Sequence, residues 1–411
     1  MISVREALDC VLQQVPRLGG EQVPLARARG RALAEAVSAR YDVPPFRNAA
    51  MDGYAASAGD VAPASGARPV RLRVIETVGA GGVPRQAVRR GAATRIMTGA
   101  LMPDGADVVV RIEDTAEAGN EVEVRAPAGP GTNVRLPGED VRAGEVVLNP
   151  GRLLRPADIG LLASIGVAMV RVACRPRVAI IATGDELVEV GQPLGPGQIV
   201  NSNAFTLASA VEEAGGEPVM LGIVRDQPDA IRNAFREACR AELVLSTGGV
   251  SVGSFDYVRQ MLNELGYEER FWKVAQKPGK PLTFGFCAGT PVFGLPGNPV
   301  SSLVCFYLYV LPALRTMMGL EKVFLASAMA TMAEAVPKAA ELTEFVRCSV
   351  TGPPEHYEVR STGSQSSGVL RSLSLGDGLI VGPPEVRVLE AGMRVRVVLL
   401  GSDTGAAEAP F

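Results

Sequence analysis

Strand and helix patterns alternate regularly between residues 177 and 246 of this 411-residue chain. Strand patterns cover Arg177–Thr183, Glu217–Val224 and Glu242–Ser246, and helix patterns separate them at Asn201–Gly215 and Pro228–Arg240. Parallel strands that are joined by helices are buried on both faces, so they give continuous apolar runs. The alternation therefore predicts a doubly wound α/β domain with a largely parallel sheet.

The rest of the chain predicts further domains, because 411 residues exceed what one hydrophobic core usually supports. Helical spacing and a capping box at Ser3 predict a helix over Ser3–Leu18, and two more helices are predicted over Arg27–Val37 and Arg155–Gly166. Short β-branched runs between Gly and Pro residues predict β-rich regions on both sides of the α/β domain. The last residues, 401–411, read as a frayed tail.

These patterns predict four domains. They are a helical and linking domain (residues 1–45 with 145–175), a small β-rich domain (46–144), an α/β domain (176–323) and a C-terminal β domain (324–411).

Composition excludes several kinds of site. A net charge of −3 gives no basic excess for nucleic acid, and no apolar run or signal-peptide core predicts a membrane or secreted location. We therefore expect a cytoplasmic protein. The six cysteines form no CxxC pair and His356 is the only histidine, which disfavours zinc sites, disulfide frameworks and histidine triads. Any chemistry must use carboxylates, lysines and hydroxyls.

Three glycine-containing loops, over residues 183–186, 246–256 and 294–302, follow predicted strands. Ligands of α/β domains bind at the carboxyl ends of strands, and free N–H groups at helix starts attract phosphate. The loops match neither the dinucleotide-binding nor the P-loop pattern. Their predicted substrate-binding residues are Thr183, Gly184, Asp185, Gly248, Gly249, Ser251, Pro296, Gly297, Asn298 and Ser301, and the carboxylates Asp185, Glu186, Asp226 and Asp256 suit Mg²⁺.

The segment Phe271–Pro281 differs in composition from the rest of the chain. It contains the only Trp and three of the five lysines, Lys273, Lys277 and Lys280, whereas the other basic residues are nearly all Arg. A lysine ammonium is a compact charge that can reach one oxygen of a small anion, and Pro and Gly fix the backbone between the lysines. The alternative is a solvated basic loop, which gives no reason for the change from Arg to Lys.

Together these segments resemble the molybdopterin molybdenumtransferases of the MoeA type, which include the gephyrin E domain. The resemblance covers nearly the whole chain and consists of PFRNAAMDGYA, TRIMTGALMPDGADVVV, PGED, ATGDEL, STGGVSVG, FWKVAQKPGKP, FGLPGNPVSS and EFVRC in the order of the family. It implies a molybdopterin-binding type of α/β domain, a C-terminal β-barrel-like domain and an elongated homodimer whose active site draws on both chains. It also implies an enzyme of molybdenum cofactor biosynthesis that inserts molybdate into adenylated molybdopterin and releases AMP with Mg²⁺.

The resemblance assigns roles to individual positions. The catalytic positions of the family fall on Asp52, Asp140, Glu186, Asp256, Lys273 and Lys277, with Thr98 as a polar neighbour. Among the strand-end carboxylates, Glu186, Asp226 and Asp256 are the predicted Mg²⁺ ligands. Molybdate would meet Lys277, Lys280, Ser301, Arg347 and the Gln365-Ser366-Ser367 run. Ser254 stands where many members carry an acidic residue, which bears on how the metal is held.

Two other functions fit parts of these observations. One is a molybdopterin adenylyltransferase-like enzyme, which shares the α/β domain but does not explain the β-rich remainder. The other is a non-catalytic scaffold like gephyrin, although the acids and lysines of the site are nearly all present. The adenylyltransferase itself is a candidate partner.

Overall fold

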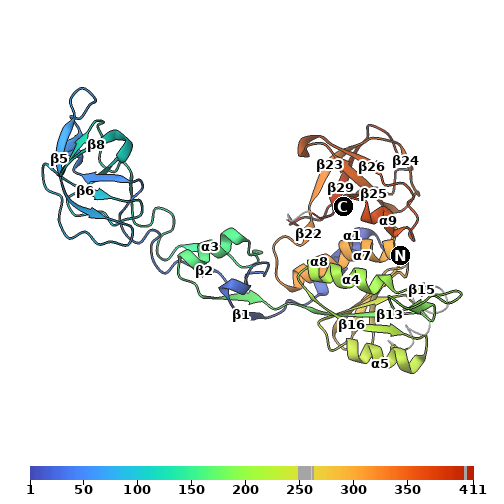
Figure 1. Ribbon diagram of the computed structural model, residues 1–411. Coiled ribbons are helices and arrows are strands. Elements are labelled where there is room, and N and C mark those ends of the chain that lie inside the picture. The colour runs from blue at the N-terminus through green and yellow to red at the C-terminus, as the bar shows by residue number, and fades with distance from the viewer. Residues whose placement is uncertain (249–260, 262, 402–404) are drawn as a thin grey trace.

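The computed structural model describes residues 1–248, 261, 263–401 and 405–411. The chain is elongated: the small β-rich domain lies at one end, the linking domain in the middle, and the α/β and C-terminal domains together at the other end (Figure 1). The N- and C-termini both lie at this second end. The predicted multidomain α/β fold is confirmed.

The α/β domain is built on a six-stranded sheet in the order β16-β13-β17-β21-β20-β18. The first four strands are parallel, and β20 pairs antiparallel with both β21 and the edge strand β18. Apolar side chains of α1, α4, α7 and α8 form one core against the sheet, and α5 contributes to a second core with residues of β13, β16 and β17. Helices on both faces confirm the doubly wound arrangement.

The elements of this part of the chain are α1 (Val4–Gln14), β13 (Arg177–Thr183), β14 (Leu187–Val188), β15 (Ile199–Val200), α4 (Ser202–Glu213), β16 (Glu217–Val224), α5 (Pro228–Ala238), β17 (Leu243–Thr247), β18 (Glu268–Trp272), β19 (Gln276–Lys277), β20 (Thr283–Cys287), β21 (Thr290–Leu295), α7 (Pro299–Cys305), a π-helical turn η3 (Phe306–Val310) and α8 (Leu311–Met317). The predicted capping box of α1 is present, with Ser3 and Glu6 bonded to each other's backbone. This helix packs with the α/β core rather than with the linking domain with which the sequence grouped it.

The linking domain has its own small core around β12 and α3. Its elements are β1 (Gly20–Pro24), η1 (Leu25–Arg27), β2 (Val37–Ser38), β11 (Val146–Leu148), α3 (Pro156–Ser164) and β12 (Met169–Ala173). The helix predicted over Arg27–Val37 was wrong. Gly30 has a left-handed backbone with φ of 74°, and Ala32 and Leu33 pair with extended segments, so tertiary pairing overrides the helix propensity of this run.

The small β-rich domain contains a six-stranded sheet in the order β7-β4-β6-β5-β9-β8. Its elements are β3 (Asn48–Ala49), β4 (Gly53–Ala56), α2 (Ala58–Val61), β5 (Val70–Val78), β6 (Ala92–Ile96), β7 (Val108–Arg111), η2 (Ile112–Asp114), β8 (Thr115–Ala118), β9 (Glu121–Val124) and β10 (Val134–Arg135). Gly53 opens β4 where that strand approaches β7 closely. A Cβ atom at this position would lie 1.9 Å from the carbonyl oxygen of Val110.

We expect Gly53→Ala to destabilise this domain by about 3 kcal/mol, because the added methyl group must push two paired strands apart. Gly59→Ala is the matched control, since the nearest atom to its Cβ would be 3.7 Å away and the residue lies in a helix that favours Ala. Calorimetric melting of both variants measures the difference. Equal melting temperatures would contradict the close approach of β4 and β7.

The C-terminal domain is a closed barrel in which β25, β26, β23, β29 and β27 pair in turn and β27 pairs again with β25. Its elements are β22 (Phe324–Leu325), β23 (Ser327–Met332), β24 (Val336–Pro337), β25 (Thr343–Thr351), η4 (Pro354–His356), β26 (Tyr357–Ser361), α9 (Leu370–Ser374), β27 (Gly378–Gly382), β28 (Val388–Leu389), β29 (Arg394–Leu399) and β30 (Gly405–Ala406). This confirms the predicted β-barrel-like domain.

The frayed C-terminal tail predicted from sequence was wrong for residues 405–411. Strand β30 pairs with β22, and the Phe411 ring packs edge-on against Phe345 at 5.8 Å. The tail is held because its short apolar side chains reach the core that the barrel shares with α1.

Within the described chain, one helical run, Pro299–Met317, is long and apolar enough to span a membrane. Of its most apolar window, 83% is buried inside the protein, so the run is the central core helix of the α/β domain.

All six cysteines are free, and three of them are buried.

Candidate active site

The lysine segment is fixed between two parts of the chain. On one side the Ile2 N–H donates to the Lys273 carbonyl at 3.2 Å, and the Ala275 N–H donates to the Ile2 carbonyl at 2.8 Å. On the other side β19 runs parallel to β25 of the barrel, with Lys277 opposite Glu344. The segment thus joins the α/β domain to the C-terminal domain.

Much of this segment is buried or half-buried, unlike a solvated loop. Gln276 is fully buried, and its amide donates to the Pro278 carbonyl at 3.1 Å and to the Cys305 Sγ at 3.4 Å, while the Tyr309 hydroxyl donates to its Oε1. Burial raises the pKa of both Cys305 and Tyr309, which keeps them protonated. A Cβ on Gly279 would lie 2.4 Å from the Cys305 sulfur, so only glycine fits there.

The three lysines of the segment have different surroundings. The Lys273 ammonium lies 4.0 Å from the centre of the Trp272 ring, in a cation–π contact, on a backbone with φ of 68°. Lys277 forms an ion pair with Glu344, and Lys280 is exposed. One segment thus holds three ammonium groups in different surroundings. This arrangement fits a segment that binds a ligand.

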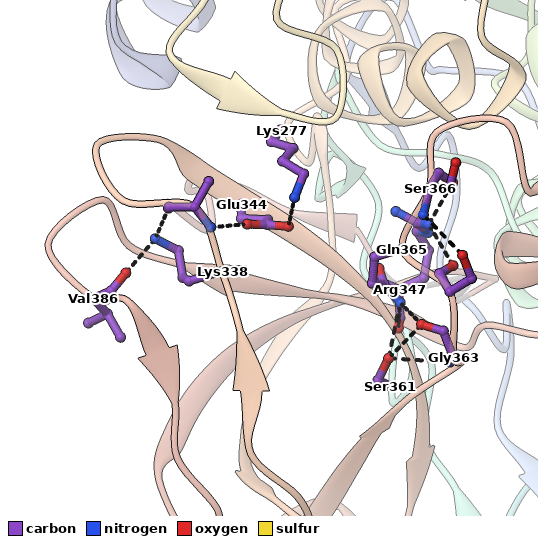
Figure 2. Close-up of polar contacts among 11 residues, drawn as sticks. Lys277, Lys338, Glu344, Arg347, Ser361, Gly363, Gln365, Ser366 and Val386 are labelled. Atoms are coloured by element: carbon purple, nitrogen blue, oxygen red, sulfur yellow. Dashed lines mark hydrogen bonds and ion pairs between the residues drawn. The ribbon is translucent and has the colours of Figure 1, made fainter.

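Figure 2 shows that Glu344 is the centre of a polar cluster below Lys277. The Lys277 Nζ lies 2.9 Å from the Glu344 Oε1, and the Ala339 N–H donates to the Glu344 Oε2 at 2.8 Å. The buried Lys338 donates to the carbonyls of Ala339 and Val386 at 2.8 and 2.7 Å. Burial lowers the pKa of Lys338, and the charge of Glu344 opposes that shift.

Arg347, three residues beyond Glu344 on β25, is 1% exposed and is the largest fully buried side chain of the described residues. Its guanidinium donates to the Ser372 hydroxyl at 3.1 Å and to the carbonyls of Ser364 and Ser366 at 3.1 and 3.0 Å (Figure 2). These partners are neutral, and burial lowers the pKa of Arg347. The guanidinium therefore supports the loop that carries the Gln365-Ser366-Ser367 run.

That loop also reaches the start of α7, where the Val300 N–H donates to the Ser367 carbonyl at 3.2 Å. Ser301, in the first turn of α7, is buried. The structure thus brings Arg347, the serine run and the α7 start together.

The carboxyl ends of β13, β17 and β21 meet at one edge of the sheet. The Asn203 amide, from the first turn of α4, donates to the Thr247 Oγ1 at 2.9 Å and to the Gly297 carbonyl at 2.8 Å. Gly248 has φ of 89°, and a Cβ there would lie 2.3 Å from the Thr183 carbonyl oxygen. The predicted loop residues Thr183, Gly248 and Gly297 therefore lie side by side, with Pro296 and Asn298 flanking Gly297.

Carboxylates gather beyond Gly184 at the same edge. The Asp226 N–H donates to the Asp185 Oδ1 at 3.3 Å, and Asp185 and Glu186 are exposed. Burial and then the charges of Asp185 and Glu186 raise the pKa of Asp226. A divalent cation would relieve the mutual repulsion of these carboxylates, and their oxygen atoms are suitable ligands for it. Among the described residues, however, no group of three metal-ligating side chains is preformed.

A pocket of about 450 Å³ is lined by residues that neighbour these carboxylates in the sequence. Its volume is within the range of small-molecule pockets. It is lined by Leu187, Val188, Glu189, Gln192, Pro193, Ile223 and Arg225.

The predicted residues of the small β-rich domain form a separate group. Asp52 accepts hydrogen bonds from the backbone N–H and the hydroxyl of Thr98, both at 2.7 Å, and these bonds lower its pKa. Asp140 is exposed near the linking domain. In one chain the small β-rich domain lies at the far end from the lysine segment (Figure 1). Gly249, Ser251, Ser254 and Asp256 lie outside the described residues.

Sequence reasoning missed three residues that build this site. They are Asn203, which bonds to two of the strand-end loops, Glu344, which pairs with Lys277, and Lys338, which lies in the same polar cluster as Glu344. Lys338 stands out in retrospect, because it is one of only two lysines outside the lysine segment.

Family models match three consecutive parts of the chain. The MoeA N-terminal region (domains I and II) matches residues 2–166, the probable molybdopterin binding domain matches 179–316, and the MoeA C-terminal region (domain IV) matches 329–400. A curated molybdopterin molybdenumtransferase from Nostoc sp. is 40% identical over 92% of this chain and 84% of its own length. The chain belongs to the MoeA family.

Other members of the MoeA family match this chain over nearly their full length. A molybdopterin molybdenumtransferase from Staphylococcus aureus is 36% identical over 99% of this chain and 97% of its own length. The crystal structure of a molybdopterin biosynthesis MoeA protein from Pyrococcus horikoshii covers 97% of this chain with 34% identity and a TM-score of 0.82. The prediction of a transferase of molybdenum cofactor biosynthesis is thereby confirmed.

Proposed function

We propose that this chain inserts molybdate into adenylated molybdopterin and releases AMP in a Mg²⁺-dependent step, in the cytoplasm. The observation that carries the proposal is the lysine segment, which presents the exposed Lys277 and Lys280 on a partly buried, hydrogen-bonded segment near the supported serine run. Cleavage of a phosphoanhydride leaves a charged phosphate, and fixed cations stabilise that charge by electrostatics and positioning. The substrates are therefore a small tetrahedral oxyanion and a nucleotide-linked pterin.

The residues divide into roles by their chemistry. Lys277, Lys280, Ser301 and the loop supported by Arg347 would bind the oxyanion through N–H and O–H donors. The strand-end loops with Gly248 and Gly297 offer close backbone approach to the pterin phosphate.

The proposal includes Mg²⁺ at the carboxylates Glu186 and Asp226, with Asp256 as the third ligand. Burial and the neighbouring charges of Asp185 and Glu186 raise the pKa of Asp226, so a cation would relieve the repulsion among these acids. When bound, Mg²⁺ would neutralise phosphate charge.

The active site would be shared between two chains of a homodimer. Asp52 and Thr98 belong to the small β-rich domain and Asp140 lies where that domain meets the linking domain. Within one chain the small β-rich domain is remote from the α/β domain (Figure 1). A two-fold dimer can bring the small β-rich domain of one chain to the α/β domain of the other.

Thr98→Val tests the role of Asp52. The variant keeps the backbone hydrogen bond to Asp52 but removes the hydroxyl one, so the pKa of Asp52 should rise. Because a carboxylate with a raised pKa protonates earlier as pH falls, the acidic limb of the rate profile should move to higher pH. Thr98→Ser, which keeps the hydroxyl, should leave the profile in place. Identical profiles for the Val variant and the parent would exclude ionised Asp52 from the reaction.

Incubation of the purified protein with adenylated molybdopterin, Mg²⁺ and molybdate tests the proposed function. AMP should appear only when all three are present. A scaffold without catalytic activity would release none.

A further inference from the structure

The ion pair between Lys277 and Glu344 is asymmetric. The Lys277 side chain is 48% exposed, whereas the Glu344 side chain is 4% exposed. The pair forms because β19 and β25 run parallel and place the two residues opposite each other. The acid is thus part of the protein interior, and the base reaches from it toward solvent.

Glu344 cannot move to follow the lysine. Its Oε2 accepts the Ala339 N–H at 2.8 Å, and Ala339 is itself bonded to the buried Lys338. The charged groups that act on Lys338 are Glu344, Glu385 and Lys277, and Glu344 also acts on Arg347. Glu344 is therefore fixed by its own contacts, with the Ala339 N–H on Oε2 and the Lys277 ammonium on Oε1.

A free lysine at this exposure would sample many rotamers, and fixing it would cost entropy when a substrate binds. A fixed carboxylate that takes one N–H of the ammonium removes that freedom in advance and leaves two N–H donors for a ligand. We propose that Glu344 is a positioning residue that holds the Lys277 ammonium where it meets an oxygen of the oxyanion substrate. This role rests on the proposed function, but the hold on Lys277 can be measured without it.

Competitive labelling of lysines with acetic anhydride measures the hold directly. In Glu344→Gln the side chain keeps its size but loses its charge, so Lys277 should react several-fold faster than in the parent. The exposed Lys322 should react equally in both proteins and serves as the internal reference. Glu334→Gln is the matched variant, because it removes an ion pair to Arg360 in the same domain and should leave Lys277 unchanged.

Kinetics then test the consequence. Glu344→Gln should lower kcat on the order of tenfold to a hundredfold at a temperature where circular dichroism shows the variant to be folded. If Glu344 acts through Lys277, the same substitution should cause no further loss in a Lys277→Ala background.

Unchanged labelling of Lys277 in Glu344→Gln would overturn the proposal, as would an equal loss of rate in both backgrounds. If the parent protein released no AMP, the proposed function would fail, and the labelling result alone would decide whether Glu344 holds Lys277.

Discussion

Lys277→Arg should lower the rate of AMP release on the order of a hundredfold although the charge is kept. The ammonium meets the buried Glu344 Oε1 at 2.9 Å from a backbone pinned by the buried Gln276 and by the β19–β25 pairing. A guanidinium is wider than an ammonium and pairs well with a carboxylate, so its pairing with Glu344 would place the remaining N–H donors at other positions than those of the ammonium. Single-turnover measurement of AMP release at low and high salt gives the rate.

The same experiment distinguishes a shaped site from a region that only attracts anions. Lys322→Arg, at an exposed position, is the control and should keep the parental rate. A purely electrostatic role for Lys277 would give near-parental rates for Lys277→Arg and a steep loss with salt in all proteins. That outcome would contradict a shaped oxyanion site at the lysine segment.

Mixing two inactive variants should restore activity if the site is shared between subunits. Asp52→Asn and Lys277→Ala should each lose on the order of a hundredfold in rate, because each removes a charged group of the proposed active site. After the two proteins exchange subunits, half of the dimers are mixed and each contains one intact site. The mixture should therefore regain about a quarter of the parental rate.

A second mixture provides the control for this result. Lys277→Ala and Glu186→Gln both lie at the α/β end of the chain, so every site in their mixed dimers carries one defect. No recovery is expected from this pair. Recovery in both mixtures, or in neither, would contradict a site built from opposite ends of two chains.

Much of the fold could be predicted from local sequence. Strand β16 has the predicted bounds Glu217–Val224, and α1, α4 and α5 follow their caps and apolar spacing. The wrong predictions fall where pairing with distant segments decides the local backbone conformation. The run from Arg27 to Val37 has helix-forming residues, but Gly30 and the bridges of Ala32 and Leu33 hold it extended.

Candidate site residues could be picked out from the sequence where their residue type is rare in the chain, but not where their placement depends on strand register. The lysines stood out because the rest of the chain uses Arg. Glu344 did not, because one glutamate among many gains its role only when β25 lies beside β19. Asn203 likewise reads as part of a helix start until the strand ends are seen together.

The most direct measurement is quantitative AMP release together with the mass of the pterin product. With adenylated molybdopterin, Mg²⁺ and molybdate, we predict one AMP for each pterin consumed, and a product that contains molybdenum. Without molybdate, or with Glu186→Gln, the adenylated pterin should be recovered intact. Recovery of intact adenylated molybdopterin from the complete reaction would contradict the assignment of this chain as a molybdate-inserting enzyme.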